Sequence, residues 1–264
     1  MIGEWMQTAN PWLVFPASVG AILLAAIAGQ ALGQRVRDRR SGEGAQHLAP
    51  LQGALVGLLS LMIGFTFSLS ASRFDARKSA VLHEATAIST AGERATLLPP
   101  PHAVEAGRLL AAYLETRILL GGEGRRPTEQ VQAIGRSHEL LNALWKEAAA
   151  VSSQAVQSQP ASLFVQSLNA VGDRGAERLA ADRSRVPLAV FLMLYGLAVA
   201  AWGFTGYVGG RAGARNMVSN LVLALAFATV IALVADLDRP GSGLVIVSQQ
   251  PLLDLRALAH PPSV

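Results

Sequence analysis

The sequence predicts an all-α membrane protein with four transmembrane helices. Hydrophobic residues make up 51% of its 264 residues and charged residues only 15%, a balance too apolar for an ordinary soluble domain of this length. Four uncharged stretches are each long enough to cross roughly 30 Å of hydrocarbon as a helix. They cover residues 12–33, 51–71, 187–209 and 217–235. Leu, Ala, Val and Ile fill these stretches without alternating polarity, which favours helices over the strands of a barrel.

The distribution of charge divides the chain into four parts. Between the second and third spans lie 14 of the 22 basic and 12 of the 18 acidic residues, so we expect a water-exposed domain there. The predicted parts are an N-terminal transmembrane hairpin at 1–71, the exposed domain at 72–186, a C-terminal transmembrane hairpin at 187–235 and a tail at 236–264. The segment before the first span holds Glu4 and no basic residue, so we expect a retained span and not a cleaved signal peptide.

Apolar residues keep a helical spacing through the exposed domain. Val81, Ala85 and Ile88 share one helix face, so the second span is expected to continue well beyond the bilayer. Arg77 and Glu84 are expected to lie largely outside that face. A run of three prolines then ends the helix. Further helices are predicted at 103–120, 128–157 and 161–185. Their inward faces are expected to include Leu110, Val131, Leu144 and Leu168.

The charges leave open on which side of the membrane this domain lies. Arg35 and Arg37 follow the first span, and Arg211 and Arg215 lie between the third and fourth. Counted over these short loops, the positive-inside rule places both loops in the cytoplasm and the domain outside. Basic residues also flank the domain itself, and long loops carry little weight in this rule. The charge count therefore does not choose between the two orientations.

Several kinds of chemistry receive no support from the sequence. The absence of cysteine excludes thiolate catalysis, cysteine-ligated metal and disulfides. No catalytic or nucleotide-binding motif occurs and the five histidines are scattered, so we expect neither an enzyme nor a cofactor. The net charge of +4 comes without a long basic run, so nucleic acid is not an expected partner. Asp236 and Asp238 are weak metal candidates, but a helix-end turn is favoured because Pro240 and Gly241 follow them.

Small residues recur along the second span at spacings of three and four. They are Gly53, Gly57, Ser60, Gly64 and Ser68. Such a stripe lets another helix approach closely. It also suits several copies of the helix around an axis, where the stripe lines a pore and Leu61 and Phe65, on an adjoining face, form an apolar constriction. The pattern alone leaves both interpretations open.

Arg73 follows this span directly and also has two interpretations. An arginine at the end of a span commonly extends its guanidinium to the membrane surface. At the mouth of a pore, the same charge would concentrate anions.

The junction between the second span and the exposed domain resembles the bestrophin signature. Ile63-Gly64-Phe65 is followed by Arg73-Phe74 and then by Ala76-Arg77-Lys78, and the spacing from Gly64 to Arg73 agrees with that signature. Over most of its length the chain is more closely similar to the bestrophin-like family of bacterial membrane proteins. The phrases that carry this resemblance are GFTFSLSASRFDARKSAVLHEATAI at 64–88 and LDRPGSGLVIVSQQPL at 237–252.

The resemblance implies a pentameric anion channel in the bacterial cytoplasmic (inner) membrane, with the helical domain in the cytoplasm and the second span lining the pore. Chloride or another small anion would then be a partner besides the lipid bilayer. Gly57, Leu61 and Phe65 fall at the positions of the hydrophobic neck residues, although glycine cannot supply a bulky apolar group. The acidic calcium clasp of animal members is reduced to Asp236 and Asp238, well short of the cation's usual set of about six to eight oxygens.

The leading functional hypothesis from the sequence is passive anion conduction by a homo-oligomer. The competing hypothesis is a non-conducting membrane scaffold or sensor. In that case the small-residue stripe packs helices together, and the exposed helices bind a partner. A membrane-embedded enzyme is disfavoured because no catalytic site is found.

Overall fold

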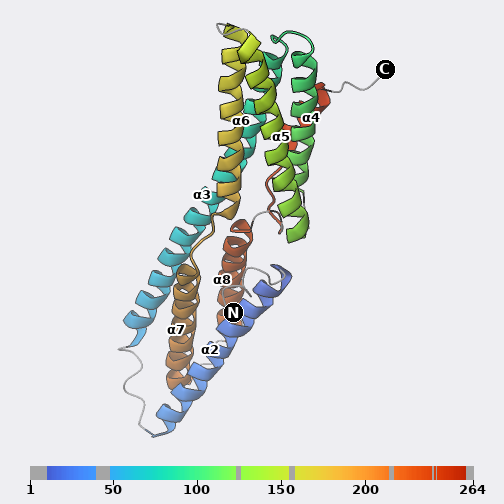
Figure 1. Ribbon diagram of the computed structural model, residues 1–264. Coiled ribbons are helices and arrows are strands. Elements are labelled where there is room, and N and C mark those ends of the chain that lie inside the picture. Colours follow the sequence, from blue (N-terminus) through green and yellow to red (C-terminus); the bar gives the residue numbers. More distant parts are fainter. Residues whose placement is uncertain are drawn as a thin grey trace. The chain divides into compact units, whose positions relative to one another are not determined.

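The computed structural model describes residues 11–39, 48–122, 126–154, 158–213, 217–239, 241 and 243–259. Within these ranges the regular structure is helical and no strand occurs, which confirms the all-α prediction (Figure 1). The helices are α2 (Pro11–Arg39), α3 (Ala49–Ala95), α4 (His102–Leu120), α5 (Pro127–Gln154), α6 (Gln159–Arg183), α7 (Leu188–Ala212), α8 (Met217–Leu237) and α9 (Gln250–Ala259).

The chain forms two compact units. The membrane unit comprises residues 1–72 and 185–239, and the helical unit comprises 73–184 and 240–264. Four segments of the described chain are long and apolar enough to cross a membrane, which confirms the predicted number of spans. They are Leu13–Arg37, Ala49–Ala95, Gln159–Ala212 and Asn220–Leu237.

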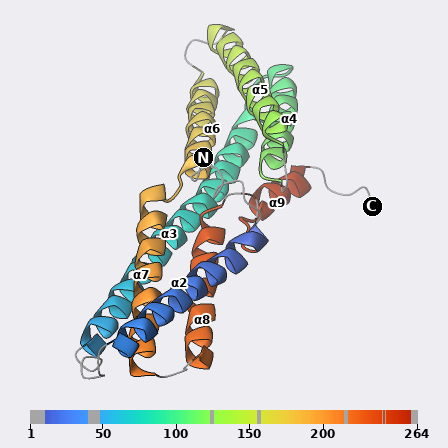
Figure 2. The same cartoon turned by 90° about the horizontal axis from the view of Figure 1, so that it is seen from below.

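In the membrane unit, α2 and α7 lie side by side with their backbones in contact (Figures 1 and 2). A Cβ atom on Gly29 would overlap the carbonyl oxygen of Gly203, and one on Gly206 would overlap the carbonyl oxygen of Ala26. Gly33 and Gly210 meet the facing backbone in the same way. Since glycine has no side chain, each helix brings its backbone against the other, and close van der Waals packing replaces the hydrophobic effect that is missing in lipid.

The rest of the membrane unit packs around apolar side chains. Trp202 and Phe227 form an edge-to-face pair with ring centroids 4.9 Å apart, an arrangement that aromatic rings favour. The helix α3 joins this core through Leu59 and Ile63, which are buried. The other fully buried members of this core are Ile22, Leu194, Ala198, Ala224, Ala228 and Ile231.

The helical unit has a core of its own, to which the C-terminal half of α3 and the helices α4, α5, α6 and α9 contribute. Its fully or almost fully buried side chains include Ile88, Leu110, Leu144, Leu168 and Leu252. The second span does continue as one helix into this unit, as the spacing of its apolar residues predicts.

The helical unit differs from the sequence prediction at Val131 and in the tail. Val131 is 69% exposed, so its predicted inward position is wrong. It lies near the start of α5, and the buried residues of that helix begin further along, at Ser137 and Leu140. The tail also contains a helix that was not predicted, α9, whose Leu252 is completely buried in the core.

A short extended segment separates α6 from α7. The C-cap residue of α6, Ser184, has extended dihedral angles, and so does Pro187, which precedes α7. Proline restrains the residue before it to extended conformations and cannot donate the hydrogen bond that a continuing helix needs. The third span therefore begins as a new helix.

The backbone contact between α2 and α7 leads to a matched pair of substitutions. We expect Gly206→Ala to destabilise the protein by about 1 to 3 kcal/mol, because its new methyl group overlaps Ala26 and the helices must separate. Gly196→Ala, on the same helix with open space around it, is expected to leave stability unchanged or slightly raised. Thermal unfolding of the detergent-solubilised protein measures both, and equal midpoints for the two variants would contradict the contact.

Candidate functional site

The small-residue stripe of α3 faces away from the rest of its chain. Open space of at least 4 Å surrounds the Cβ positions of Gly53, Gly57 and Gly64. Ser60 and Ser68 are exposed as well. Leu61 is 54% exposed and Phe65 is 64% exposed. Within the described residues no helix of the same chain packs against the stripe, so this face is open to contact with another molecule.

The register of α3 separates a buried face from an exposed one. Leu59, Ile63, Thr66 and Ser70 are buried, at spacings of four, three and four. On the opposite side, Gly57, Leu61, Gly64 and Ser68 follow the same spacing and are exposed. Leu61 is therefore the bulky member of an otherwise small line, with a glycine about one turn away on each side. We call these four residues the exposed line of α3.

The helix register places Asp75 and not Arg73 on the continuation of this line. Asp75 follows Ser68 by seven residues and is exposed. Arg73 falls on the other side of the helix, where it is partly buried. Its Nη1 atom is buried and makes no hydrogen bond with any described residue. A side chain in this position does not present its full charge to water.

A cluster of buried charges lies in the helical unit around Glu84, whose side chain is completely buried. The carboxylate forms ion pairs with Arg117 of α4 and with Arg178 of α6, the latter at 2.6 Å between Arg178 Nη1 and Glu84 Oε2. Arg178 also donates a hydrogen bond of 2.7 Å to Gln249, directly before α9. The charge of one carboxylate thus joins α3, α4, α6 and the segment that leads into α9.

Other residues complete the surroundings of Glu84. Arg117 also donates a hydrogen bond, 3.1 Å long, to the carbonyl oxygen of Gly175. A side chain at Gly175 would obstruct this region, since a Cβ atom there would lie 2.8 Å from the hydroxyl of Tyr113. Burial raises the pKa of Tyr113 to about 12. Burial also raises the pKa of Asp182, against the opposing effect of Arg178, Arg77 and Arg117.

Sequence reasoning missed this cluster, and its placement of Arg77 and Glu84 was wrong. Both residues are almost completely buried, although we expected them largely outside the apolar face of α3. The missed signal is their spacing, because Arg77, Val81, Glu84 and Ile88 follow one another by four, three and four residues. Charged residues at such positions are placed outside a core by default, and only a partner from another helix reverses that expectation.

The acidic pair at the end of α8 has a structural role. Asp238 is buried, and its Oδ1 atom accepts a hydrogen bond of 2.7 Å from the backbone N–H of Val186, just before α7. Asp236 is buried as well. Within the described residues, no group of three or more His, Cys, Asp or Glu side chains is arranged to hold a metal ion. The hydrogen bond from Val186 ties the beginning of α7 to the end of α8.

These features define a multi-pass α-helical membrane protein with a separate helical unit. The model of the Bestrophin-like domain matches residues 20–252, and the chain belongs to this family. This confirms the resemblance found in the sequence. No curated protein matches the chain.

The fold is also similar to crystal structures of a bacterial bestrophin homologue from Klebsiella pneumoniae. One mutant of that protein matches with a TM-score of 0.67 at 15% identity, covering 92% of this chain and 98% of the other. A second mutant matches with a TM-score of 0.63 at 15% identity, over 89% and 99% of the two chains. A third structure, phased by Zn-SAD, gives a TM-score of 0.62 at 17% identity, over 93% and 98%.

The buried cluster leads to a second matched pair of substitutions. We expect Glu84→Gln to destabilise the fold by about 3 to 5 kcal/mol, because two buried guanidinium groups lose their counter-charge. Glu177→Gln removes a half-exposed ion pair with Arg174 and should cost less than about 1 kcal/mol. The midpoints of thermal unfolding compare the two, and a similar loss in both variants would mean that Glu84 does not hold the helices together.

Proposed function

We propose that copies of this chain assemble, as a pentamer by family resemblance, into a passive ion channel of the bacterial cytoplasmic membrane with α3 facing the central axis. The observation that carries this proposal is the exposed line of α3, an apolar and small-residue face that no other helix covers among the residues the structure describes. The helical unit, which contains the C-terminal half of α3, has a core of its own. Contacts between copies of this unit would add to those between the membrane units.

The composition of this face fits a narrow path better than a lipid contact. Glycines at positions 57 and 64 leave room near an axis, while Leu61 between them projects a bulky apolar group. A ring of such groups, one from each copy, makes a hydrophobic constriction that resists wetting and so gates ions. Phe65 lies on the adjoining side of the helix and adds a second apolar side chain from each copy to this constriction.

Two observations bear on which ion passes through the proposed channel. Family resemblance favours a small anion such as chloride. At the level of Asp75 the continuation of the exposed line favours a cation instead, because this carboxylate is exposed there while Arg73 lies on the other side of the helix; the exposed Lys78 follows three residues further along. A ring of carboxylates attracts cations and repels anions. Conduction of cations is therefore the second candidate function.

Flux through liposomes tests conduction. We expect the purified protein to release ions faster than empty vesicles, and Leu61→Ala to raise that flux several-fold because the apolar barrier shrinks. Phe65→Ala should act in the same direction. Separate gradients of chloride and of potassium, measured with Asp75→Asn beside the wild type, identify the favoured ion.

A matched control and two outcomes make this test decisive. Leu192→Ala removes an equally exposed leucine from α7, 52% exposed against 54%, and should leave the flux unchanged. Flux equal to that of empty vesicles would favour the non-conducting scaffold. A monomer in mass photometry would exclude the shared path, since one chain does not enclose an axis.

Topology is tested separately with single cysteines in a chain that has none of its own. By resemblance the helical unit is cytoplasmic, so Gly122→Cys in that unit should resist an impermeant thiol reagent in intact cells. Ala212→Cys, at the end of α7, is exposed and should be labelled from outside. The reverse pattern would support the orientation that short-loop charges favour.

A further inference from the structure

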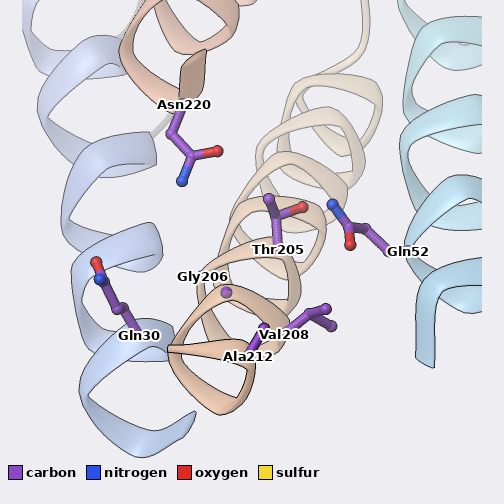
Figure 3. A pocket seen from close by; sticks show the side chains of 8 residues that line it. Gln30, Gln52, Thr205, Gly206, Val208, Ala212 and Asn220 are labelled. Carbon is purple, nitrogen blue, oxygen red and sulfur yellow. The ribbon is translucent and has the colours of Figure 1, made fainter. Parts of the chain in front are cut away.

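A partly open cavity of about 200 Å³, lined by both polar and apolar groups, lies in the membrane unit (Figure 3). It lies between the C-terminal parts of α2 and α7 and the first turns of α3 and α8. Its lining residues are Gln30, Gln52, Thr205, Gly206, Val208, Gly209, Ala212 and Asn220. The cavity is separate from the exposed line of α3, because none of the four residues of that line contributes to it.

Each of the four spanning helices contributes one uncharged polar side chain to this cavity. These are Gln30 from α2, Gln52 from α3, Thr205 from α7 and Asn220 from α8. Polar side chains inside membrane spans are costly unless they are hydrogen-bonded, and they commonly mark functional sites. Four such residues at one place are therefore a stronger signal than any one of them.

Within the described part of the chain, these four side chains have no hydrogen-bond partner. Thr205 Oγ1 is buried and unpaired. The carboxamides of Gln30, Gln52 and Asn220, which are partly buried, also make no side-chain hydrogen bond with a described residue. Buried polar groups are normally satisfied by protein, water or ligand. The cavity thus offers several donors and acceptors to a molecule that enters it.

The cavity stays open because its α7 side is built from small residues. Gly206, Gly209 and Ala212 line it, so no large side chain fills the space. At about 200 Å³ it is larger than the cavity of about 150 Å³ that holds one benzene ring in another protein. A compact molecule of roughly six to eight non-hydrogen atoms fits this volume.

The lining selects the chemistry of the ligand. Each carboxamide presents two N–H donors and one carbonyl acceptor, and the threonine hydroxyl both donates and accepts. An anion would use only the donors and a cation only the acceptors, and none of the described residues that line the cavity carries a charge to neutralise either. A molecule with several hydroxyl groups satisfies both kinds of group without a charge.

We propose that this cavity binds a small uncharged polyol of about the size of glycerol. The same chemistry is available from two sources, a free polyol in solution or the glyceryl headgroup of a membrane lipid. The position of the cavity near the ends of the spans is accessible to both. The proposal does not depend on ion conduction.

Binding of glycerol to the full-length protein tests the proposal by saturation-transfer NMR, in a detergent whose headgroup carries no hydroxyl group. The wild type should transfer saturation to glycerol, and Thr205→Val combined with Asn220→Leu should weaken binding by about tenfold or more, since two hydrogen-bonding groups are lost while side-chain size is kept. Thr229→Val on α8 is the matched control, because its hydroxyl bonds to Leu225 in its own helix and lies outside the cavity. This control should bind glycerol like the wild type.

A second arm identifies the source of the polyol. The protein is reconstituted in equal parts of phosphatidylglycerol and phosphatidylethanolamine, and the retained lipids are identified by native mass spectrometry. Preferential retention of phosphatidylglycerol by the wild type, but not by the double variant, assigns the site to the lipid headgroup, whereas glycerol binding without that preference assigns it to a free polyol. Absence of both signals overturns the proposal. Displacement of glycerol by chloride or sodium, or equal loss of binding in Thr229→Val, overturns it as well.

Discussion

The membrane unit depends on the contact between the backbones of α2 and α7. In lipid, apolar side chains gain little by meeting one another, so helices associate where their surfaces fit most closely. Glycines at 29 and 33 on α2, and at 206 and 210 on α7, bring carbonyl groups against the positions where side chains would begin. The helices α3 and α8 pack against this pair through apolar side chains.

The contact of α2 with α7 has a consequence for α3. This helix joins the core of the membrane unit by the side that carries Leu59 and Ile63, while no described part of the chain packs against its small-residue stripe. Small residues recur at similar spacings on α2, α7 and α3. Those of α2 and α7 contact each other within the molecule, whereas those of α3 have no described neighbour. The proposed assembly follows from this difference.

The helical unit is held together by a different kind of interaction. Its apolar core is ordinary, but the charge of Glu84 is shared between arginines of two other helices, and one of these arginines reaches Gln249 before α9. Buried ion pairs of this kind contribute modestly to stability, but removing one member is costly because the remaining charge stays buried. The loss of Glu84 would therefore affect every helix that its two arginines join.

The sequence by itself determined the class of the protein, the four spans and the continuation of α3 beyond the membrane, because long apolar runs and helical spacing are properties of local segments. It also identified the family through short phrases around Arg73 and Arg239. The tertiary structure alone decided that Arg77 and Glu84 are buried, that Val131 is exposed and that the tail forms α9. It also showed which glycine stripe has a partner and brought four polar side chains from four helices to one cavity. These facts depend on which helix lies beside which, and periodicity within one segment carries no information about its neighbours.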